Sequence, residues 1–141
     1  MNVGALIDIE QIKQVKARYF RFVDTKQWAE LADLFTEDCE VRYGETEQDA
    51  WITGRVALIR LLQRAIGDGV TVHHGHMPEV TLHSQTTASL VIAMFDYVES
   101  AGDRPIRLRG YGHYHESYIR SDDGLWRIRR LQLTRLRVDP L

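Results

Sequence analysis

The sequence contains only one cysteine, Cys39, among its 141 residues. No disulfide can therefore form within the chain, and a reducing compartment, the cytoplasm, is expected. The first residues lack a basic segment followed by an apolar run, so we expect no secretory signal. No apolar run approaches the roughly 20 residues that a membrane-spanning helix needs. We therefore expect no membrane association.

An excess of charge of either sign is also missing. Eighteen basic and twenty acidic residues give a formal net charge of −2, which offers no electrostatic basis for binding nucleic acid or an anionic membrane. The largest basic cluster, residues 127–137, alternates with apolar residues and is interpreted as the outward face of a strand. There is no repeat, low-complexity tract or linker. The length predicts one domain, residues 1–141.

The N-terminal half has the apolar spacing of helices. One stripe runs through Ile9, Ile12, Val15, Tyr19, Phe22 and Val23. Asp8 is the expected N-cap of this helix, with Gln11 completing a capping box. A short second helix is expected from Trp28, with Leu34 and Phe35 on its apolar face, and a third helix between Gly54 and Gly67. A short strand at 39–43 and a loop at 44–48 are expected between them.

From Val70 onward the period changes to that of strands. Long strands are predicted at 72–83, 86–100, 106–120 and 125–138. Pro78 indicates a bulge or an edge position in the first of them. The second is apolar on both alternating faces, which is typical of a central strand covered on two sides. Helices followed by an antiparallel meander predict an α+β fold, a curved sheet that forms a cone with an open mouth.

Five of the six histidines lie in two short segments of these strands, residues 72–79 and 111–116. They are His73, His74, His76, His113 and His115. Because strand side chains alternate with a period of two, His74 and His76 lie on the face of their strand opposite to His73. His113 and His115 lie together on one face of theirs. Only a subset can therefore face an interior pocket. For each of them, the alternative to a functional role is that of an ordinary half-exposed strand histidine, hydrogen-bonded to a neighbour.

His74, His76 and Glu79 offer a metal-binding alternative. Their spacing is similar to the His-x-His…Glu ligands of cupins, and imidazoles suit zinc, iron or nickel. The spacing to the glutamate is shorter than in cupins, however, and the second cupin motif is missing. Three N-terminal helices also differ from the start of a jelly roll. We therefore expect no metal among the catalytic groups.

Asp24 could pair with one of the strand histidines. It falls where the first predicted helix ends, and a carboxylate there opposes the helix dipole at a cost of up to about 1 kcal/mol. A carboxylate on one ring nitrogen of a histidine raises the basicity of the other, which produces a general base near neutral pH. The pattern alone equally allows Asp24 to be an ordinary helix-end residue.

Three segments resemble a known family. They are Lys16 to Trp28 with its Tyr-x-x-x-x-Asp spacing, His73 to Val80, and Gly124 to Ile128. Together they are similar to SnoaL-like proteins of the nuclear transport factor 2-like superfamily. The motifs are closest to the branch of bile-acid dehydratases, scytalone dehydratase and lindane dehydrochlorinases. The resemblance extends roughly from Ile9 to Val138.

The resemblance implies a cone-shaped α+β barrel with about three N-terminal helices. It also implies a cofactor-independent lyase that performs a dehydratase-type elimination on a hydrophobic, steroid- or polyketide-like cyclic molecule. Carried over by position, His73 and Asp24 would form the base dyad, and Tyr19 would bind the substrate oxygen. Further substrate-binding positions are expected at Arg135, Tyr114, His115 and Trp51. Trp51 either lines the mouth or anchors its loop.

Alternatives from other classes remain open at this level. The same dyad could serve an isomerase or a polyketide cyclase, and the same fold serves as a non-catalytic ligand-binding or assembly module. Retention of Tyr19, Asp24 and His73 together favours an enzyme. The family implies a homo-oligomer, a dimer or a trimer, and the strands at 86–100 and 106–120 would suit an interface.

Overall fold

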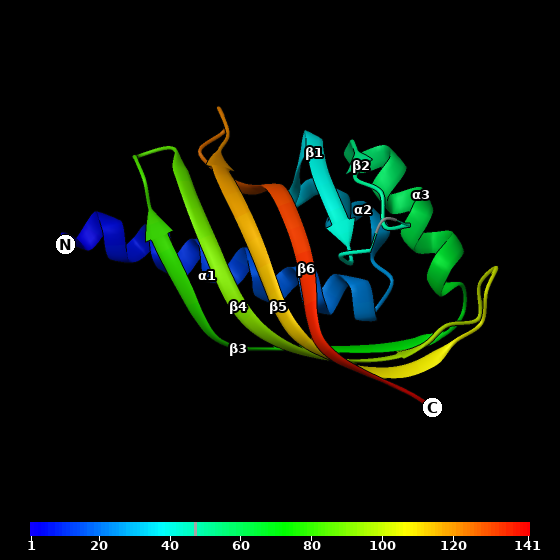
Figure 1. The fold of residues 1–141 in the computed structure, drawn as a ribbon. Helices are drawn as coiled ribbons and strands as arrows, with labels where there is room; N and C mark the ends of the chain where they lie inside the picture. The colour runs from blue at the N-terminus through cyan, green and yellow to red at the C-terminus, as the bar shows by residue number, and fades with distance from the viewer. Residues whose placement is uncertain (47) are drawn as a thin grey trace.

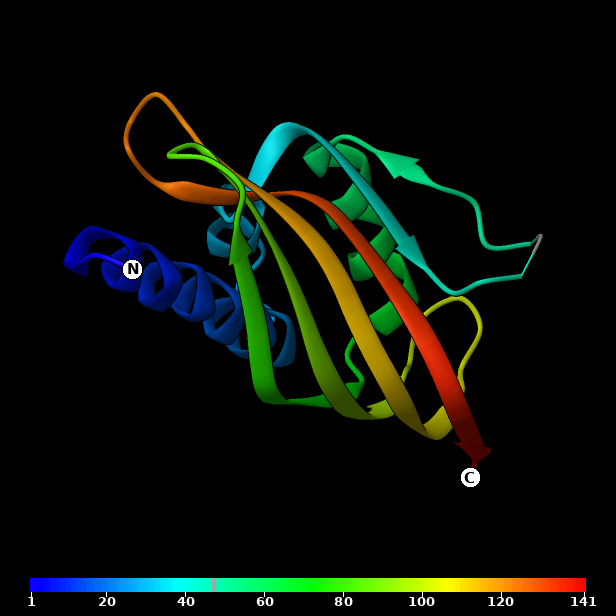
Figure 2. The same cartoon turned by 60° about the vertical axis from the view of Figure 1, so that its left-hand side comes forward.

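The computed structural model describes all residues except Glu47. Its elements are α1 (Val3–Asp24), α2 (Trp28–Asp33), β1 (Phe35–Tyr43), β2 (Ile52–Thr53), α3 (Arg55–Ile66), β3 (Val70–Leu82), β4 (Thr87–Glu99), β5 (Arg107–Arg120) and β6 (Trp126–Pro140). The long strands bend strongly, so that their lower parts turn beneath α3 (Figure 1). The same curl is seen from a second side in Figure 2. No helix in the described part of the chain is long and apolar enough to cross a membrane.

The six strands form one sheet in the order β2-β1-β6-β5-β4-β3. β1 lies parallel to β6, and all other neighbours are antiparallel. This mixed sheet with three helices confirms the expected α+β fold. The strand β2 was not predicted, because two residues are too short to show a period. The loop expected at 44–48 includes Glu47, which lies outside the described residues.

The first helix begins earlier than expected. Its N-cap is Asn2, whose side-chain oxygen accepts a hydrogen bond from the backbone N–H of Ala5 at 2.8 Å. The prediction of Asp8 as N-cap is therefore wrong. Asp8 lies inside α1 and binds the side chains of Arg120 and Trp126 on the sheet. A capping pattern inside a longer helix carries no local mark that distinguishes it from a helix start.

The boundary between α2 and β1 also differs from the prediction. α2 ends at Asp33, and Phe35 already belongs to β1, where it faces Ile128 of β6. Phe35 was assigned to the helix because its spacing from Leu31 fits a helical stripe. It is fully buried in the strand, and the apolar face of a helix also requires a buried residue, so its hydrophobicity does not distinguish helix from strand.

Pro78 lies in a bulge on an edge strand, as expected. The pairing of β3 with β4 shifts between His76 and Glu79, and Met77 adopts a positive φ of 50°. The shift places Glu79 opposite Val91. One extra residue in a strand reverses the face that the following residues occupy. Glu79 is therefore exposed on the same outer face as His74 and His76.

β4 is covered on only one face by its own chain. Ala88, Leu90, Ile92 and Met94 are buried against the helices. The alternating residues Val91, Ala93 and Phe95 are only half-buried on the outer face. The expectation of a strand covered on two sides is corrected accordingly, because all three helices pack on the concave side of the sheet.

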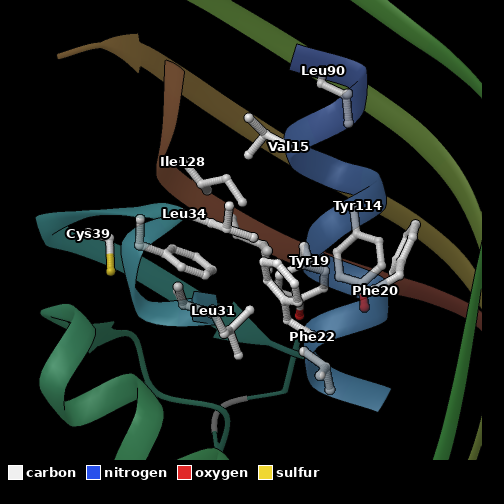
Figure 3. Packing of buried hydrophobic residues seen from close by; sticks show 14 of the residues in the cluster. Val15, Tyr19, Phe20, Phe22, Leu31, Leu34, Cys39, Leu90, Tyr114 and Ile128 are labelled. Carbon is white, nitrogen blue, oxygen red and sulfur yellow. The ribbon is translucent and has the colours of Figure 1, made fainter. Parts of the chain in front are cut away.

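The core lies between the helices and this concave face. Figure 3 shows how α1 lays an aromatic and aliphatic stripe against the strands, with Tyr19 and Phe20 next to Tyr114. The Tyr19 and Tyr114 rings meet edge to face, with centroids 5.9 Å apart. Each fully buried side chain of this size contributes on the order of 1.5–3 kcal/mol to stability. These contacts fix α1 against the centre of the sheet.

Candidate active site

Asp24 and His73 meet where the end of α1 crosses β3. The carboxylate Oδ1 of Asp24 lies 2.6 Å from Nδ1 of His73, and its Oδ2 accepts the backbone N–H of His73 at 2.8 Å. The hydroxyl of Thr71 also donates to Oδ1, at 2.9 Å. Three donors thus hold one carboxylate. The structure brings the two residues of the predicted dyad together.

This contact determines the tautomer of His73. An ionised carboxylate only accepts hydrogen bonds, so Nδ1 of His73 carries the proton and Nε2 keeps a free electron pair when the ring is neutral. The ring of Phe20 lies nearly parallel to the imidazole, at 12° and a centroid distance of 6.1 Å. The His73 side chain is only 10% exposed. The ring is therefore held in one orientation with its basic nitrogen directed inward.

Gly75 makes this arrangement possible. A Cβ at Gly75 would lie 2.5 Å from the ring of Phe20 and 2.7 Å from Ile92. A methyl group at such a distance would push Phe20 out of its position beside the imidazole. The glycine between His74 and His76 thus has a packing role.

Asp96 is a second carboxylate near His73, and the sequence analysis missed it. It stands opposite His73 in the β3–β4 pair, with Oδ2 3.9 Å from Nε2 of His73. Its side chain is only 3% exposed. The sequence contained a pattern that could have revealed it, because Asp96 continues the inward-facing alternation of Leu90, Ile92 and Met94. A charged residue in such a series is costly to bury unless it is paired.

Arg135 is the positively charged partner of the buried Asp96 carboxylate. Its Nη1 and Nη2 donate to Oδ1 and Oδ2 of Asp96 at 2.8 and 2.9 Å, a bidentate contact. Burial disfavours the charged guanidinium, but the hydrogen bonds and charge of Asp96 raise the pKa of Arg135 above its ordinary value. Gly110 lies beneath the pair, where a methyl group would overlap both side chains. Arg135 thus lies on the inner side of the sheet, where it is bound to Asp96.

Tyr19 and Tyr114 also face the interior. The hydroxyl of Tyr19 lies 2.8 Å from the hydroxyl of Tyr43, a residue that the sequence analysis did not single out. Burial, followed by the neighbouring phenols, raises the pKa of Tyr19 well above its ordinary value, and burial does the same for Tyr114. Both phenols therefore stay protonated at any physiological pH. A protonated, buried phenol is a hydrogen-bond donor suited to a substrate oxygen.

A buried ion pair lies behind these phenols. The ammonium of Lys16 binds Glu116, which also accepts the hydroxyl of Tyr118 at 2.6 Å. The same ammonium lies 3.9 and 3.5 Å from the ring centroids of Tyr19 and Tyr114. Burial lowers the pKa of Lys16 to about 8, although Glu116 opposes the shift. These contacts fix the two phenol rings from the core side.

Two predicted substrate-binding residues lie elsewhere. His115 is exposed on the outer face, where its Nε2 meets the hydroxyl of Thr134 at 3.0 Å. It cannot face the interior together with Tyr114, because successive strand residues point to opposite faces. Trp51 stacks against Arg130, whose guanidinium carbon lies 4.2 Å from its ring centroid. Trp51 therefore anchors its loop on the outer side, and neither residue joins the interior group.

A cleft of about 600 Å³ opens away from the dyad, between α1, α2 and the hairpin that joins β5 to β6. Its walls include Val15, Phe22, Leu34 and Trp126. Charged residues lie at its edge, among them the ion pair of Asp33 and Arg127. It lacks an acid–base pair comparable to the dyad, so we place the chemistry in the interior of the cone. No group of three or more metal-ligating side chains is assembled among the described residues.

Comparisons with known structures show similar folds. A protein from Novosphingobium aromaticivorans, assigned provisionally as a scytalone dehydratase, is 26% identical; the match covers 100% of this chain and 92% of that chain, with a TM-score of 0.84. A hexachlorocyclohexane dehydrochlorinase from Novosphingobium barchaimii is 17% identical, with 100% and 94% coverage and a TM-score of 0.83. A nuclear transport factor 2-like protein from Novosphingobium aromaticivorans is 24% identical, with 94% and 84% coverage and a TM-score of 0.75.

The sequence itself matches one family model. The match spans residues 4–132, from the first turn of α1 to the middle of β6, and so includes both members of the dyad. The fold is that of the nuclear transport factor 2-like proteins. The chain belongs to the family of SnoaL-like domains.

Proposed function

We propose that this protein is a cofactor-independent lyase that eliminates water from a hydrophobic cyclic small molecule of steroid or polyketide type. The observation that carries the proposal is the hydrogen bond of 2.6 Å between Asp24 and Nδ1 of His73. It leaves the opposite ring nitrogen free to accept a proton inside the cone. A histidine oriented by a carboxylate is the usual form of a protein general base.

In the proposed reaction, Nε2 of His73 removes a proton from a carbon next to a carbonyl group. The electron pair of that C–H bond forms a carbon–carbon double bond as the neighbouring C–O bond breaks. The leaving oxygen takes up the proton that His73 removed and departs as water, so the imidazole is neutral again at the end of the cycle. Asp24 stabilises the imidazolium that forms in the first step. No metal or organic cofactor takes part in this scheme.

The phenols and the arginine would bind the oxygens of the substrate. Tyr19 would donate a hydrogen bond to the oxygen that gains negative charge, with Tyr114 beside it. Removal of one such preorganised donor commonly lowers the rate by roughly 10²–10³-fold. Arg135 would contact the substrate from the side that Asp96 leaves open, since the Arg135 side chain is 24% exposed. The buried position of the phenols excludes water that would compete for these hydrogen bonds.

The similar structures support an elimination. One is a protein assigned provisionally as a scytalone dehydratase, a name that describes the loss of water. Another is a hexachlorocyclohexane dehydrochlorinase, a name that describes the loss of hydrogen chloride. Both are reactions in which a base removes a proton and a leaving group departs. The dyad described above supplies the base for a reaction of this kind.

Mass spectrometry of reaction mixtures tests the proposal. The purified protein is incubated with a panel of hydroxylated cyclic ketones of steroid and aromatic polyketide type. We expect at least one substrate to lose the mass of one water molecule, and His73→Gln to abolish this loss. His83→Gln is the matched control, since His83 lies outside the cone and bonds to Ser89. A product of unchanged mass would instead indicate an isomerase and would overturn the proposed elimination.

We also propose that the protein forms a homo-oligomer, a dimer or a trimer, in the cytoplasm. Proteins of this fold family are often oligomeric. The free thiol of Cys39 is buried, which suits a reducing compartment. Native mass spectrometry would report the number of subunits and any hydrophobic ligand that co-purifies. A monomer under these conditions would contradict the proposed assembly.

A further inference from the structure

Four histidines share the outer face of the sheet, on the side opposite the dyad. His74 and His76 point outward from β3, and His113 and His115 point outward from β5, because alternate residues of a strand share a face. Only β4 separates the two strands. A His-x-His pair therefore occurs twice on one surface. The proposed elimination uses none of these four side chains.

Each pair comes close to the spacing of a metal chelate. The ring centroids lie 6.3 Å apart in the pair His74 and His76, and also 6.3 Å apart in the pair His113 and His115. An imidazole nitrogen binds a zinc ion at roughly 2.0–2.1 Å, which puts two ring centroids on one ion roughly 4.5 Å apart at a right angle and roughly 5.2 Å apart in a tetrahedron. The observed separations are wider by roughly 1 Å, so both rings must turn toward each other to share an ion. Small rotations of the side chains would bring both nitrogens of a pair onto one ion.

These rotations cost little. His74, His76 and His115 are exposed, and His113 is half-buried. In the part of the chain that the structure describes, only His115 among the four has a side-chain hydrogen bond, from Nε2 to Thr134. Exposed side chains change rotamer within picoseconds to nanoseconds. Metal binding on this face therefore requires no change in the backbone or the core.

The surroundings leave room for an ion and place one carboxylate near the two pairs. His76 and His113 stand on either side of Ala93, whose small side chain leaves the space between the pairs open. The bulge at Pro78 brings the carboxylate of Glu79 to the same face, in line with Val91 and His115. A polar hollow of about 290 Å³, lined in part by Ser89, Ser117 and Gln132, lies beside His115.

Two arginines at the edge of this face are already engaged. The guanidinium of Arg130 lies over the ring of Trp51. Arg137 donates from Nε to Asp139 at 2.6 Å. Arg130 also lines the hollow beside His115, and Arg109 is exposed on the outer face of β5. Solvent screens the repulsion that these charges exert on an ion at this exposed face.

We propose that the outer face binds borderline divalent transition-metal ions through its two chelating pairs, His74 with His76 and His113 with His115. Each pair supplies two neutral imidazole nitrogens, and water completes the coordination. Each ion would have only two protein ligands, since no group of three or more metal-ligating side chains is assembled among the described residues. We expect copper(II) to bind more tightly than nickel(II) or zinc(II), as imidazole sites generally do.

Isothermal titration of the untagged protein with copper(II) and with nickel(II) tests the proposal, after removal of bound metal with a chelator. We expect two sites per chain. His74→Gln and His113→Gln should each remove one site, and the double variant should remove both. His83→Gln and His73→Gln should keep both sites, since neither residue belongs to a pair.

All these substitutions except His73→Gln replace outward side chains, and circular dichroism should show an unchanged fold. The proposal is overturned if the wild-type protein binds no more metal than the double variant. It is equally overturned if His83→Gln removes as much binding as His74→Gln. The experiment does not depend on catalytic activity, so its result is independent of the proposed elimination.

Discussion

Asp24→Asn should change the tautomer of His73. The carboxylate of Asp24 accepts three hydrogen bonds, one of them from the backbone N–H of His73 at 2.8 Å. A backbone N–H can only donate, so the single amide oxygen of asparagine must take that position. The amide NH₂ then faces Nδ1 of His73, which must become an acceptor. The ring proton consequently moves to Nε2, and the basic nitrogen no longer faces the interior.

The expected loss of activity is large, while the loss of stability is moderate. In a triad that relies on the same orientation, the exchange of aspartate for asparagine lowers kcat by about 10⁴-fold through the wrong tautomer. We expect Asp24→Asn to lower kcat of this protein by about 10³–10⁴-fold. Hydrogen bonds to a charged group contribute about 1.5–3 kcal/mol each, so the free energy of unfolding should fall by an amount of this order.

Nitrogen-15 NMR of the histidine rings detects the change without a substrate. The wild-type protein should show His73 protonated at Nδ1 when the ring is neutral, and Asp24→Asn should show it protonated at Nε2. Asp33→Asn is the matched control, because Asp33 is 67% exposed and pairs with Arg127 far from His73. If the Asp24→Asn variant keeps its proton on Nδ1, the reasoning about the dyad is refuted.

Three further predictions concern the packing around the site. Gly75→Ala should lower the free energy of unfolding by about 1–3 kcal/mol, since its Cβ would overlap Phe20; an unchanged melting temperature would contradict this. Lys16→Met should destabilise the fold by about 3–5 kcal/mol, because it leaves Glu116 buried and unpaired. Chemical denaturation should show that Glu116→Gln in the same chain restores much of this loss, and no restoration would speak against the ion pair. Burial raises the pKa of four phenols above the ordinary value of 10.0: Tyr19, Tyr43, Tyr114 and Tyr118. Because these groups hold their protons longer in the folded state, stability should be complete below pH 10 and fall as the pH rises above it. Alkaline denaturation followed by phenolate absorbance checks this, and phenolate formation by all six tyrosines before unfolding would contradict it.

The fold and the contact between Asp24 and His73 could be predicted from the sequence for identifiable reasons. The stripe of α1 and the alternation in the long strands follow directly from helical and strand periods. The pairing of Asp24 with His73 required the family resemblance, because the two residues are 49 positions apart and neither period relates them. The same limit explains the omission of Asp96. Its importance depends on the register that places it opposite His73 and within reach of Arg135.

The errors have an equally physical origin. Asp8 carries a good capping pattern, but α1 extends through it to Asn2, because tertiary contacts with Arg120 and Trp126 stabilise the extra turn. His115 was grouped with Tyr114 by position in the family, although the strand period separates their faces. Trp51 lies in an irregular segment, where no period indicates the direction of a side chain.

Proton removal by the dyad is the central claim, and hydrogen exchange at carbon measures it most directly. A cyclic ketone that the protein converts is incubated in deuterated water, and proton NMR follows the C–H group next to its carbonyl. We predict that the wild-type protein and the Asp33→Asn control deplete this signal, whereas His73→Gln and Asp24→Asn leave it at the rate of the uncatalysed reaction. Equal depletion by the wild-type protein and the two dyad variants would contradict the account.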